Sequence, residues 1–538
     1  MSDYLLKEDS DKLLQETGDG ILLEQQDLFK IINEVINISE TKNKLRGPIK
    51  IINEVINISE TKNKLRGPIK IINEVINAIE NFIKICFGYV TAIKASQRNI
   101  KPKVEIYFNG ENYPPIIFGS ESVAFINFLE EAQAEGETPL GSVSSNEVII
   151  TFINDNQYFN PNNTESPYYE KLLPNLLVKP YFGIKRDDDS FEWISLGYFY
   201  TGEWDSNSED IYANVTCHDR LYNIGQKDAP LIPTMMNATK AIIFETLFGA
   251  IGLTSSDYEI DATLTDIVPI TYFPKGKIRD ALGILAVAFN CTVTVLRNNK
   301  IKVINNETLT KSMTTYTGSD MVIGTNAPQR FEDIYSEIQI NYYIHEVDDK
   351  TSILRIEDLV VPPEGLTLDN LEFSGAPIAF VSHIKIPDNA YVTISSLEIG
   401  TWGMNIVLAN SGASQTITLE VFGYPFKITE GQVSKKNETA FNLVGEKILP
   451  INNYLIQTKA DALSQIQLLL PIVTDPKAYV ECTTRGDMSL EIGYTITIAD
   501  AANKLAATDV IPIRYEYRYD GGLQCDIKSI KKSAREGG

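Results

Sequence analysis

The chain has 538 residues, of which 43% are hydrophobic and 22% are charged. This composition is ordinary for a globular protein, and at roughly 150 residues per domain it predicts about three to four domains. The 71 acidic residues outnumber the 48 basic ones, which gives a net charge of −23. Because a surface of that sign repels phosphate backbones, we do not expect nucleic acid as a partner.

The five cysteines are widely spaced and form no CxxC pair, so free buried thiols are expected rather than a zinc site or a disulfide framework. The acidic N-terminus lacks the basic start and apolar core of a secretory signal, which favours assembly in a cytoplasm. The most apolar long stretch, 71–93, contains Glu74, Glu80 and Lys84. These charges argue against a membrane span.

The N-terminal region is built from repeats. A short Leu-rich unit over 1–30, seen in LLKEDSDK and LLQETGDG, predicts an extended arm. The region 31–100 begins with IINEVINISETKNKLRGPIK at 31–50, which recurs identically at 51–70 and starts a third time at residue 71. The apolar spacing favours short helices joined by LRGP turns, although the β-branched residues leave a strand interpretation open.

The third copy carries a heptad pattern. Its apolar residues are spaced alternately by four and three, as at positions a and d, and isoleucine at both positions favours three-stranded assembly. The candidate oligomer interface therefore consists of Ile72, Ile76, Ile79, Ile83, Cys86, Val90 and Ile93. The alternative is an amphipathic helix that packs on its own subunit.

From residue 101 the pattern changes to strands. We expect a β domain over 101–225, an α+β domain over 226–330, a second β domain over 331–532 with a β-sandwich-like insertion near 354–433, and a tail at 533–538. Within them, we expect helices beginning near Thr239 and Ile278, a third helix ending at Pro471, and hairpin turns at 298–299 and 521–522. The expected fold class is a β-rich, multidomain α+β protein.

Residues able to carry catalysis are sparse, with three histidines in the chain: His218, His345 and His383. Cys217, His218 and Asp219 are adjacent, but consecutive strand side chains face opposite sides, so no nucleophile and base pair is expected. Two acidic groups are interpreted as solvated strand ends rather than metal ligands: Glu346, Asp348 and Asp349 beside His345, and the run 187–189. We expect no enzymatic activity, no cofactor and no metal.

Two further motifs have structural interpretations. Arg485-Gly486-Asp487 matches an adhesion tripeptide, but Gly-Asp before a strand commonly forms a turn. An aromatic-rich stretch offers rings to a sugar, yet most of them are expected in strand cores. These rings are Tyr107, Tyr158, Phe159, Tyr168, Tyr169, Trp193, Tyr198, Tyr200 and Trp204.

A series of motifs follows in a fixed order along 101–532. It contains PLGSVSSNEVIITFINDNQYFNPNNTESPYY at 139–169, then LLVKPYFGI, WISLGYFYTGEWD and VTCHDRLYNIG, then FPKGKIRDALGILAVAFNCTVTVLRNNKIKV at 273–303, and last SLEIGYTITI and YEYRYDGGLQCDIKSIKK. In this order the motifs resemble the hub proteins of bacteriophage tail tips and baseplates, including the hubs of phage-tail-like bacteriocins. Tyr494 stands where that family more often has Asp.

The resemblance implies a trimeric ring of tube-like β-barrel domains, here over 101–225 and 331–532, that adapts a six-fold tail tube to three-fold tip structures. It implies a place in the virion tail. The implied partners are further copies of the chain and tail tube, baseplate and fibre or spike proteins. The N-terminal repeats are not part of the family pattern.

Two other functions are considered. In the first, the chain is a carbohydrate-binding tail fibre or adhesin whose insertion near 354–433 contacts a glycan on the host surface. In the second, it is a cell-wall hydrolase fused to a tail protein. The second is less favoured because no paired acid, zinc-ligand or Cys/His motif stands out in the sequence.

Overall fold

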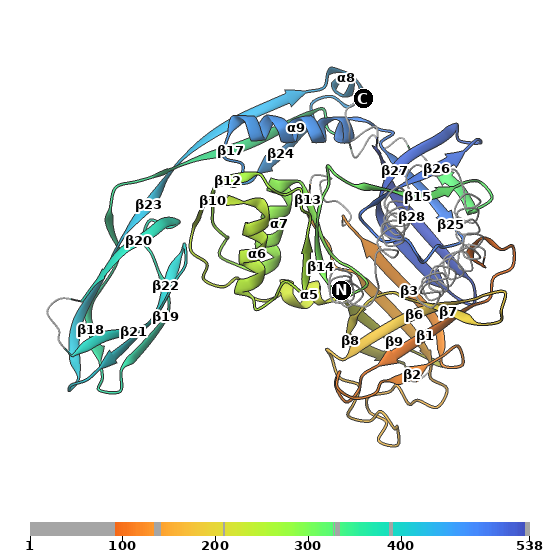
Figure 1. The fold of residues 1–538 in the computed structure, drawn as a ribbon, viewed down its shortest axis with the longest axis horizontal. Coiled ribbons are helices and arrows are strands. Elements are labelled where there is room, and N and C mark those ends of the chain that lie inside the picture. The colour runs from red at the N-terminus through yellow and green to blue at the C-terminus, as the bar shows by residue number, and fades with distance from the viewer. Residues whose placement is uncertain are drawn as a thin grey trace, which may run out of the picture. The chain divides into compact units, whose positions relative to one another are not determined.

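The computed structural model describes residues 92–133, 141–207, 210–326, 328, 334–386 and 391–532. The chain divides into two units, Met1–Gly88 and Tyr89–Gly538, and every described element belongs to the second. Strands dominate this unit and helices are interspersed among them, so the expected β-rich α+β fold is confirmed (Figure 1). The repeats over 1–70 and most of the heptad region lie outside the described residues.

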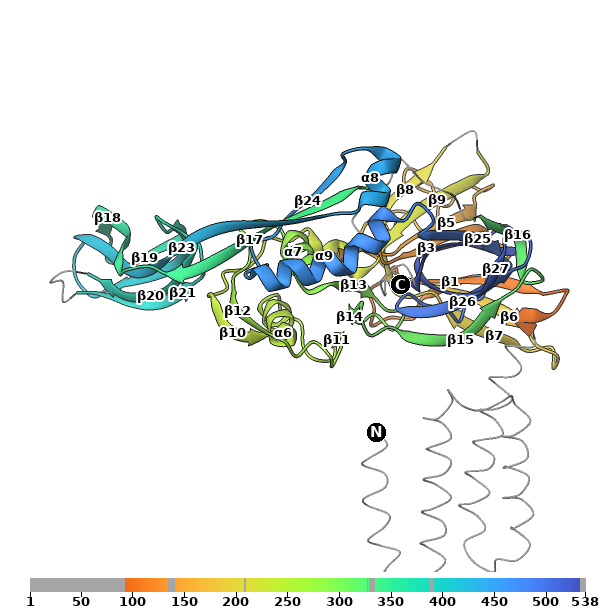
Figure 2. The same ribbon diagram turned by 90° about the horizontal axis from the view of Figure 1, so that it is seen from above.

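A curled, 14-stranded sheet contains strands from both ends of the described chain (Figure 2). Its order is β16-β25-β28-β27-β3-β5-β9-β8-β6-β1-β2, with β15 beside β26, β26 beside β27 and β7 beside β6. The earlier strands are β1 (Ile100–Ile106), β2 (Ile116–Phe118), β3 (Val123–Glu131), β5 (Glu147–Ile153), β6 (Leu177–Lys185), β7 (Phe191–Ser195), β8 (Phe199–Ser206) and β9 (Tyr212–His218). The later strands are β15 (Thr310–Tyr316), β16 (Met321–Asn326), β25 (Tyr479–Thr484), β26 (Tyr494–Asp500), β27 (Leu505–Tyr519) and β28 (Leu523–Lys531).

Period-two patterning produces the core of this sheet. In β5 and β9 every second side chain is buried, which places one apolar face of each strand inside the curl. The two groups of strands meet where β3 pairs antiparallel with β27. At that junction the rings of Phe128 and Tyr517 stack with their centroids 5.7 Å apart, and both side chains are almost completely buried.

The middle of the chain forms a separate α+β core. In α7, Ile278, Leu282, Leu285 and Phe289 fall on one buried stripe, as the 3.6-residue period requires. Asn290 ends the helix in the left-handed conformation with φ 53°. The elements here are β4 (Ser142–Val143), α5 (Arg220–Gly225), β10 (Met235–Thr239), α6 (Lys240–Ala250), β11 (Tyr258–Ile260), β12 (Ile267–Thr271), α7 (Ile278–Phe289), β13 (Cys291–Val295) and β14 (Ile301–Asn305).

A β-sandwich follows, made by two sheets that enclose their own core. The 22-residue strand β23 pairs with β18 and β20 through its first half and with β17 through its second, while β19, β22 and β21 form the facing sheet. The elements are β17 (Glu337–Val347), β18 (Thr351–Val361), β19 (Leu366–Glu372), β20 (Ile378–Lys385), β21 (Val392–Ile399), β22 (Gly403–Asn410), β23 (Gln415–Lys436), α8 (Glu438–Val444), β24 (Ile448–Asn452) and α9 (Lys459–Thr474). Below, "the sandwich" means β18 to β22 with the first half of β23.

One helix end differs from the prediction. We expected the third helix to end at Pro471, but α9 continues to Thr474. Proline removes one backbone donor from the helix ladder. The last turn persists because Ile472 and Val473 are buried, and because the Thr474 hydroxyl donates to the Leu470 carbonyl at 2.7 Å.

The other local predictions are confirmed. Helix α6 begins after Thr239, whose hydroxyl accepts from the Ile242 amide, and α7 begins at Ile278. Turns join β13 to β14 and β27 to β28, with Asn299 and Gly521 at positive φ. No helix among the described residues is long and apolar enough to span a membrane.

Two glycines give opposite stability predictions. A Cβ atom on Gly141 would overlap the backbone of Ala286 in α7, whereas a Cβ on Gly283, inside α7, would meet no atom within 4 Å. We expect Gly141→Ala to lower the free energy of unfolding by about 1–3 kcal/mol, and Gly283→Ala to raise it by about 0.5–1 kcal/mol. Urea unfolding followed by circular dichroism measures both, and equal effects of the two changes would contradict the packing described here.

Candidate functional site

Of the seven heptad residues, the structure describes Ile93, and the other six lie outside the described residues. Ile93 sits in a helical turn and is 7% exposed, packed within the core of the curled sheet. Just beyond it, Arg98 donates to the carbonyls of Gly486 and Leu523, and Arg485 donates to those of Ala95 and Ser96. These contacts, made in both directions, hold the segment that precedes β1 against the C-terminal part of the curled sheet.

Those contacts also settle the role of the adhesion-like tripeptide within this fold. The Arg485 guanidinium is engaged by the 95–96 backbone, and the Asp487 carboxylate accepts from the Ser489 amide and hydroxyl at 3.0 and 2.6 Å. Gly486 has φ 79°, which is the turn geometry expected from the sequence. The motif is a structural turn.

Cys217, His218 and Asp219 diverge as the strand alternation predicts. Cys217 is buried in the core of the curled sheet, and burial raises the pKa of its thiol. His218 lies on the other face, stacked on Tyr222 with ring centroids 4.1 Å apart, and burial lowers its pKa. A protonated, buried thiol beside a histidine that faces away from it gives no nucleophile and base pair.

Asp219 has a structural role. It caps α5, accepting from the amides of Leu221 and Tyr222, and its second oxygen accepts from the Asn146 amide at 2.6 Å. Burial raises the pKa of this carboxyl to about 7. The side chain therefore joins a helix start to the loop before β5.

The acidic group around His345 does not converge on a metal. His345 Nε2 is 3.1 Å from the Tyr272 hydroxyl and Nδ1 is 2.8 Å from the Tyr343 carbonyl, while Glu346, Asp348 and Asp349 are exposed. Burial lowers the His345 pKa. Within the described ranges, no group of three or more His, Cys, Asp or Glu side chains is placed to hold a metal ion. In the run 187–189, Asp188 accepts from the Ser190 amide and Asp189 pairs with Lys185.

The aromatic-rich stretch divides between core and surface. Phe159, Tyr168 and Trp204 pack in one aromatic cluster with Phe118 and Phe152 inside the curled sheet, so those rings are core residues as expected. Others are partly exposed: Tyr158 at 38%, Tyr169 at 37% and Trp193 at 39%.

A buried ion pair that the sequence did not reveal joins three parts of the chain. Arg297, in the β13–β14 turn, contacts Glu130 of β3 at 2.7 Å, and the two side chains are 8% and 5% exposed. The guanidinium also donates to the carbonyls of Met488 and Leu490, and the second Glu130 oxygen accepts from the Ile492 amide at 2.8 Å. Burial lowers the pKa of Arg297, but the charge of Glu130 and weaker contributions from Tyr517 and Glu491 outweigh it, so that the already high pKa is raised.

Two aromatic rings lie close to this pair. The Arg297 guanidinium lies 5.5 Å from the centroid of the Phe128 ring and 5.9 Å from that of Tyr517, the two rings stacked at the β3–β27 junction. Planar stacking and a fork of directed donors suit arginine specifically. The pair thus fixes the middle α+β core against the seam between early and late strands. We define these two residues as the junction ion pair.

The junction ion pair gives a sharp test. Glu130→Gln removes the carboxylate that contacts the buried guanidinium, and we expect a loss of about 3–5 kcal/mol in the free energy of unfolding. The double change Glu130→Leu with Arg297→Met removes both charges and is expected to be much less damaging than either single removal. Denaturant unfolding of Glu130→Gln, Arg297→Met and the double variant measures this; a Glu130→Gln protein as stable as the original would contradict it.

The sequence matches no protein-family model and no curated protein. Among solved structures, the chain is similar to the 43 kDa tail protein of prophage MuSo2 from Shewanella oneidensis, with TM-score 0.46, 9% identity and coverage of 81% of this chain and 99% of that one. It is similar to the tail protein from Neisseria meningitidis, with TM-score 0.46, 7% identity and coverage of 81% and 98%. It is also similar to prophage tail protein gp18 from Listeria monocytogenes, with TM-score 0.39, 8% identity and coverage of 80% and 95%. These structures are tail proteins, the class that the sequence motifs resemble.

Proposed function

We propose that the chain is a structural component of a phage tail or phage-tail-like particle, where it acts as the hub that joins the tail tube to fibres, spike or receptor-binding parts. The ordered motifs over 101–532 support this. The observation that carries it is the position of β3, which pairs with β5 of the first motif on one side and with β27 of the last motif on the other, so that both ends of the series share one sheet. The strands at the ends of this sheet then have edges that can contact neighbouring protein molecules.

Those edges support assembly with further copies. The terminal strands of the long path through the described sheet are β16 and β2. On β16, Val322 is 48% and Ile323 is 65% exposed, and Ile117 on β2 is 59% exposed. Exposed apolar edges invite pairing unless they are covered. We propose that β16 of one copy lies against β2 of the next, a head-to-tail contact that closes as a ring of three.

The heptad region adds a second contact to the proposal. Ile93 packs inside its own chain, so a three-stranded seam would use the six positions from Ile72 to Val90. The partners proposed outside the trimer are tail tube, baseplate and fibre or spike proteins, and the proposed location is the virion tail tip. The burial of the four cysteines that the structure describes, and the stacking of His218 on Tyr222, fit a role that requires no enzymatic chemistry.

The edge contact predicts a change of assembly state. Ile323→Lys places a charge in the proposed interface and should lower the fraction of trimers at micromolar concentration, because an unpaired charge is costly to bury. Leu443→Lys is the matched control, since Leu443 on α8 is 54% exposed and lies outside the sheet. Mass photometry distinguishes three copies from one. A trimer that tolerates Ile323→Lys, or an original chain that remains monomeric, argues against the ring.

The seam predicts a separate loss. Ile76→Asp with Ile83→Asp would bring like charges together in an apolar interface at a cost of several kcal/mol per subunit, so assembly through this region should fail. Asn73→Asp with Asn81→Asp adds the same carboxylates at positions other than a and d of the heptad, and this variant should assemble normally. The midpoint temperature of thermal unfolding should be the same in both variants as in the original chain. Normal particle incorporation of the isoleucine variant would show that the seam is an ordinary surface.

A further inference from the structure

The loop between β1 and β2 contains the single Asn-Gly pair of the sequence, Asn109-Gly110. Both residues are exposed. When glycine follows asparagine, the backbone nitrogen between them can approach the side-chain amide closely, because glycine has no Cβ atom and few restrictions on its backbone. The contacts of this pair in the folded protein therefore decide whether the two groups are free to react with each other.

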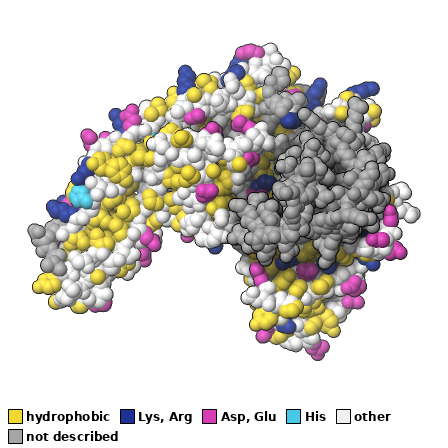
Figure 3. Space-filling model, viewed as in Figure 1, with side chains coloured by type: hydrophobic (Ala, Val, Ile, Leu, Met, Phe, Trp, Pro, Cys, Tyr) yellow, Lys and Arg dark blue, Asp and Glu magenta, His cyan; other side chains and the backbone are white. Residues whose placement is uncertain are grey.

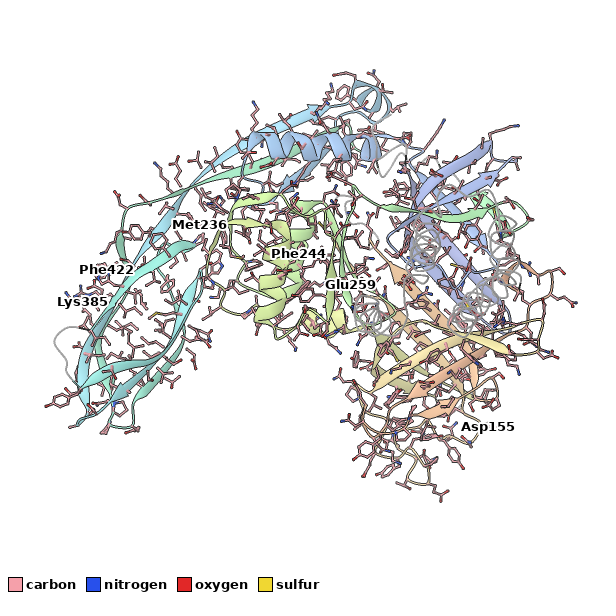
Figure 4. All side chains as sticks on the ribbon, in the orientation of Figure 1. Asp155, Met236, Phe244, Glu259, Lys385 and Phe422 are labelled. Carbon is pink, nitrogen blue, oxygen red and sulfur yellow. The ribbon has the colours of Figure 1, made fainter. Side chains whose placement is uncertain are left out.

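The loop is held at its base. Phe108 is 8% exposed, and its ring stacks on that of Tyr168 with the centroids 5.2 Å apart. Tyr168 belongs to the long loop that follows β5 and begins near Asp155, which Figure 4 labels. Figure 3 shows acidic and hydrophobic side chains together on the surface of this end of the molecule. Asn109 thus follows directly on a buried, packed residue but is itself exposed to water.

Few contacts restrain the Asn-Gly pair. The Asn109 side chain forms no hydrogen bond with any residue that the structure describes. The Gly110 amide donates to the Tyr107 carbonyl at 3.2 Å, the upper end of the normal range, and Gly110 has φ 91°. A Cβ atom on Gly110 would meet no atom within 4 Å, so the space around this residue is open. Only one weak hydrogen bond has to open before the Gly110 nitrogen can react.

Another asparagine with a small successor is arranged in the opposite way. Asn410 precedes Ser411, and its Nδ2 donates to three backbone carbonyls at 2.8 to 3.2 Å. The Ser411 amide donates to the Tyr391 carbonyl at 2.9 Å. Both groups that would have to react are therefore held by hydrogen bonds, which makes Asn410 a control within the same chain.

We propose that Asn109 is a site of spontaneous deamidation in the folded protein. The backbone nitrogen of Gly110 attacks Cγ of Asn109, and a new N–Cγ bond forms while the Cγ–Nδ2 bond breaks. Nδ2 leaves as ammonia, taking the proton that the Gly110 amide loses. Water then opens the resulting succinimide at one of its two carbonyl groups, which gives aspartate or isoaspartate at position 109. The reaction consumes one water molecule and requires no oxidant, reductant or enzyme.

The products change the chemistry of the loop. Each adds a negative charge close to Glu111, in a chain whose net charge is already −23. Isoaspartate also adds a methylene group to the main chain, which moves the Gly110 amide relative to the Tyr107 carbonyl. Chains that have stood for longer therefore become more acidic at this end of the curled sheet. The reaction does not depend on the proposed ring, so its failure would leave the assembly proposal unaffected.

Peptide mapping by mass spectrometry tests this after the folded full chain has been incubated at mildly alkaline pH. Digestion with pepsin in acid keeps the digestion itself from causing deamidation. We expect a mass gain of about 1 Da at Asn109 that accumulates roughly tenfold faster or more than at Asn410. The rate should rise with pH, because the attacking nitrogen must lose its proton. Electron-transfer fragmentation should detect isoaspartate as well as aspartate.

Two controls accompany this measurement. Asn109→Gln keeps a side-chain amide but would have to close a larger ring, so position 109 should stay unconverted while the thermal midpoint is unchanged. In concentrated urea the hydrogen bonds of Asn410 are lost, and the difference between Asn410 and Asn109 should become smaller.

Three results would overturn the proposal. The first is that Asn109 converts no faster than Asn410 in the folded chain. The second is that Asn109 converts in urea but not in the folded chain, which would mean that the loop protects it. The third is that aspartate forms without isoaspartate, because direct hydrolysis of the side chain, and not attack by the Gly110 nitrogen, would then be the route.

Discussion

The junction between β3 and β27 is the constraint on which the rest of the described structure depends. Glu130 and the Ile492 amide that it accepts from are 362 residues apart in sequence, and the carboxylate also holds Arg297 from the middle of the chain. One buried carboxylate thus fixes early strands, late strands and the α+β core in a single arrangement. Bringing together residues so far apart in sequence costs chain entropy that local structure does not offset. The buried contact between Glu130, Arg297 and the Ile492 amide must therefore be a favourable one.

The pairing of β3 with β27 also determines which strands lie at the ends of the curled sheet. With the two strand groups joined through β3 and β27, the long path through the described sheet ends at β16 and β2, while the sandwich is formed by strands that take no part in the curled sheet. The edges proposed for assembly are therefore separate from the sandwich. Cysteine and aspartate are residue types that often take part in catalysis. In this structure Cys217 packs in the core and Asp219 caps a helix.

Local features were predictable from sequence, and distant pairings were not. Thr239, the 3.6-residue period after Ile278 and the Asn298-Asn299 turn act within a few residues, and the structure has the helices and hairpin they predict. The prediction that the third helix ends at Pro471 was wrong, because burial of Ile472 and Val473 outweighs the loss of one backbone hydrogen-bond donor. Arg297 occupies a turn, where arginine is usually solvated, and its partner could not be identified without the β3–β27 register.

The central claim is that this body is an assembly unit whose unpaired edges are covered by further copies of itself. Electron cryomicroscopy of the purified full chain at micromolar concentration tests it most directly. The account predicts a three-fold ring in which density for β16 of one copy continues into β2 of the next. Particles that are single copies with both edges facing solvent, or filaments without closure, would contradict it.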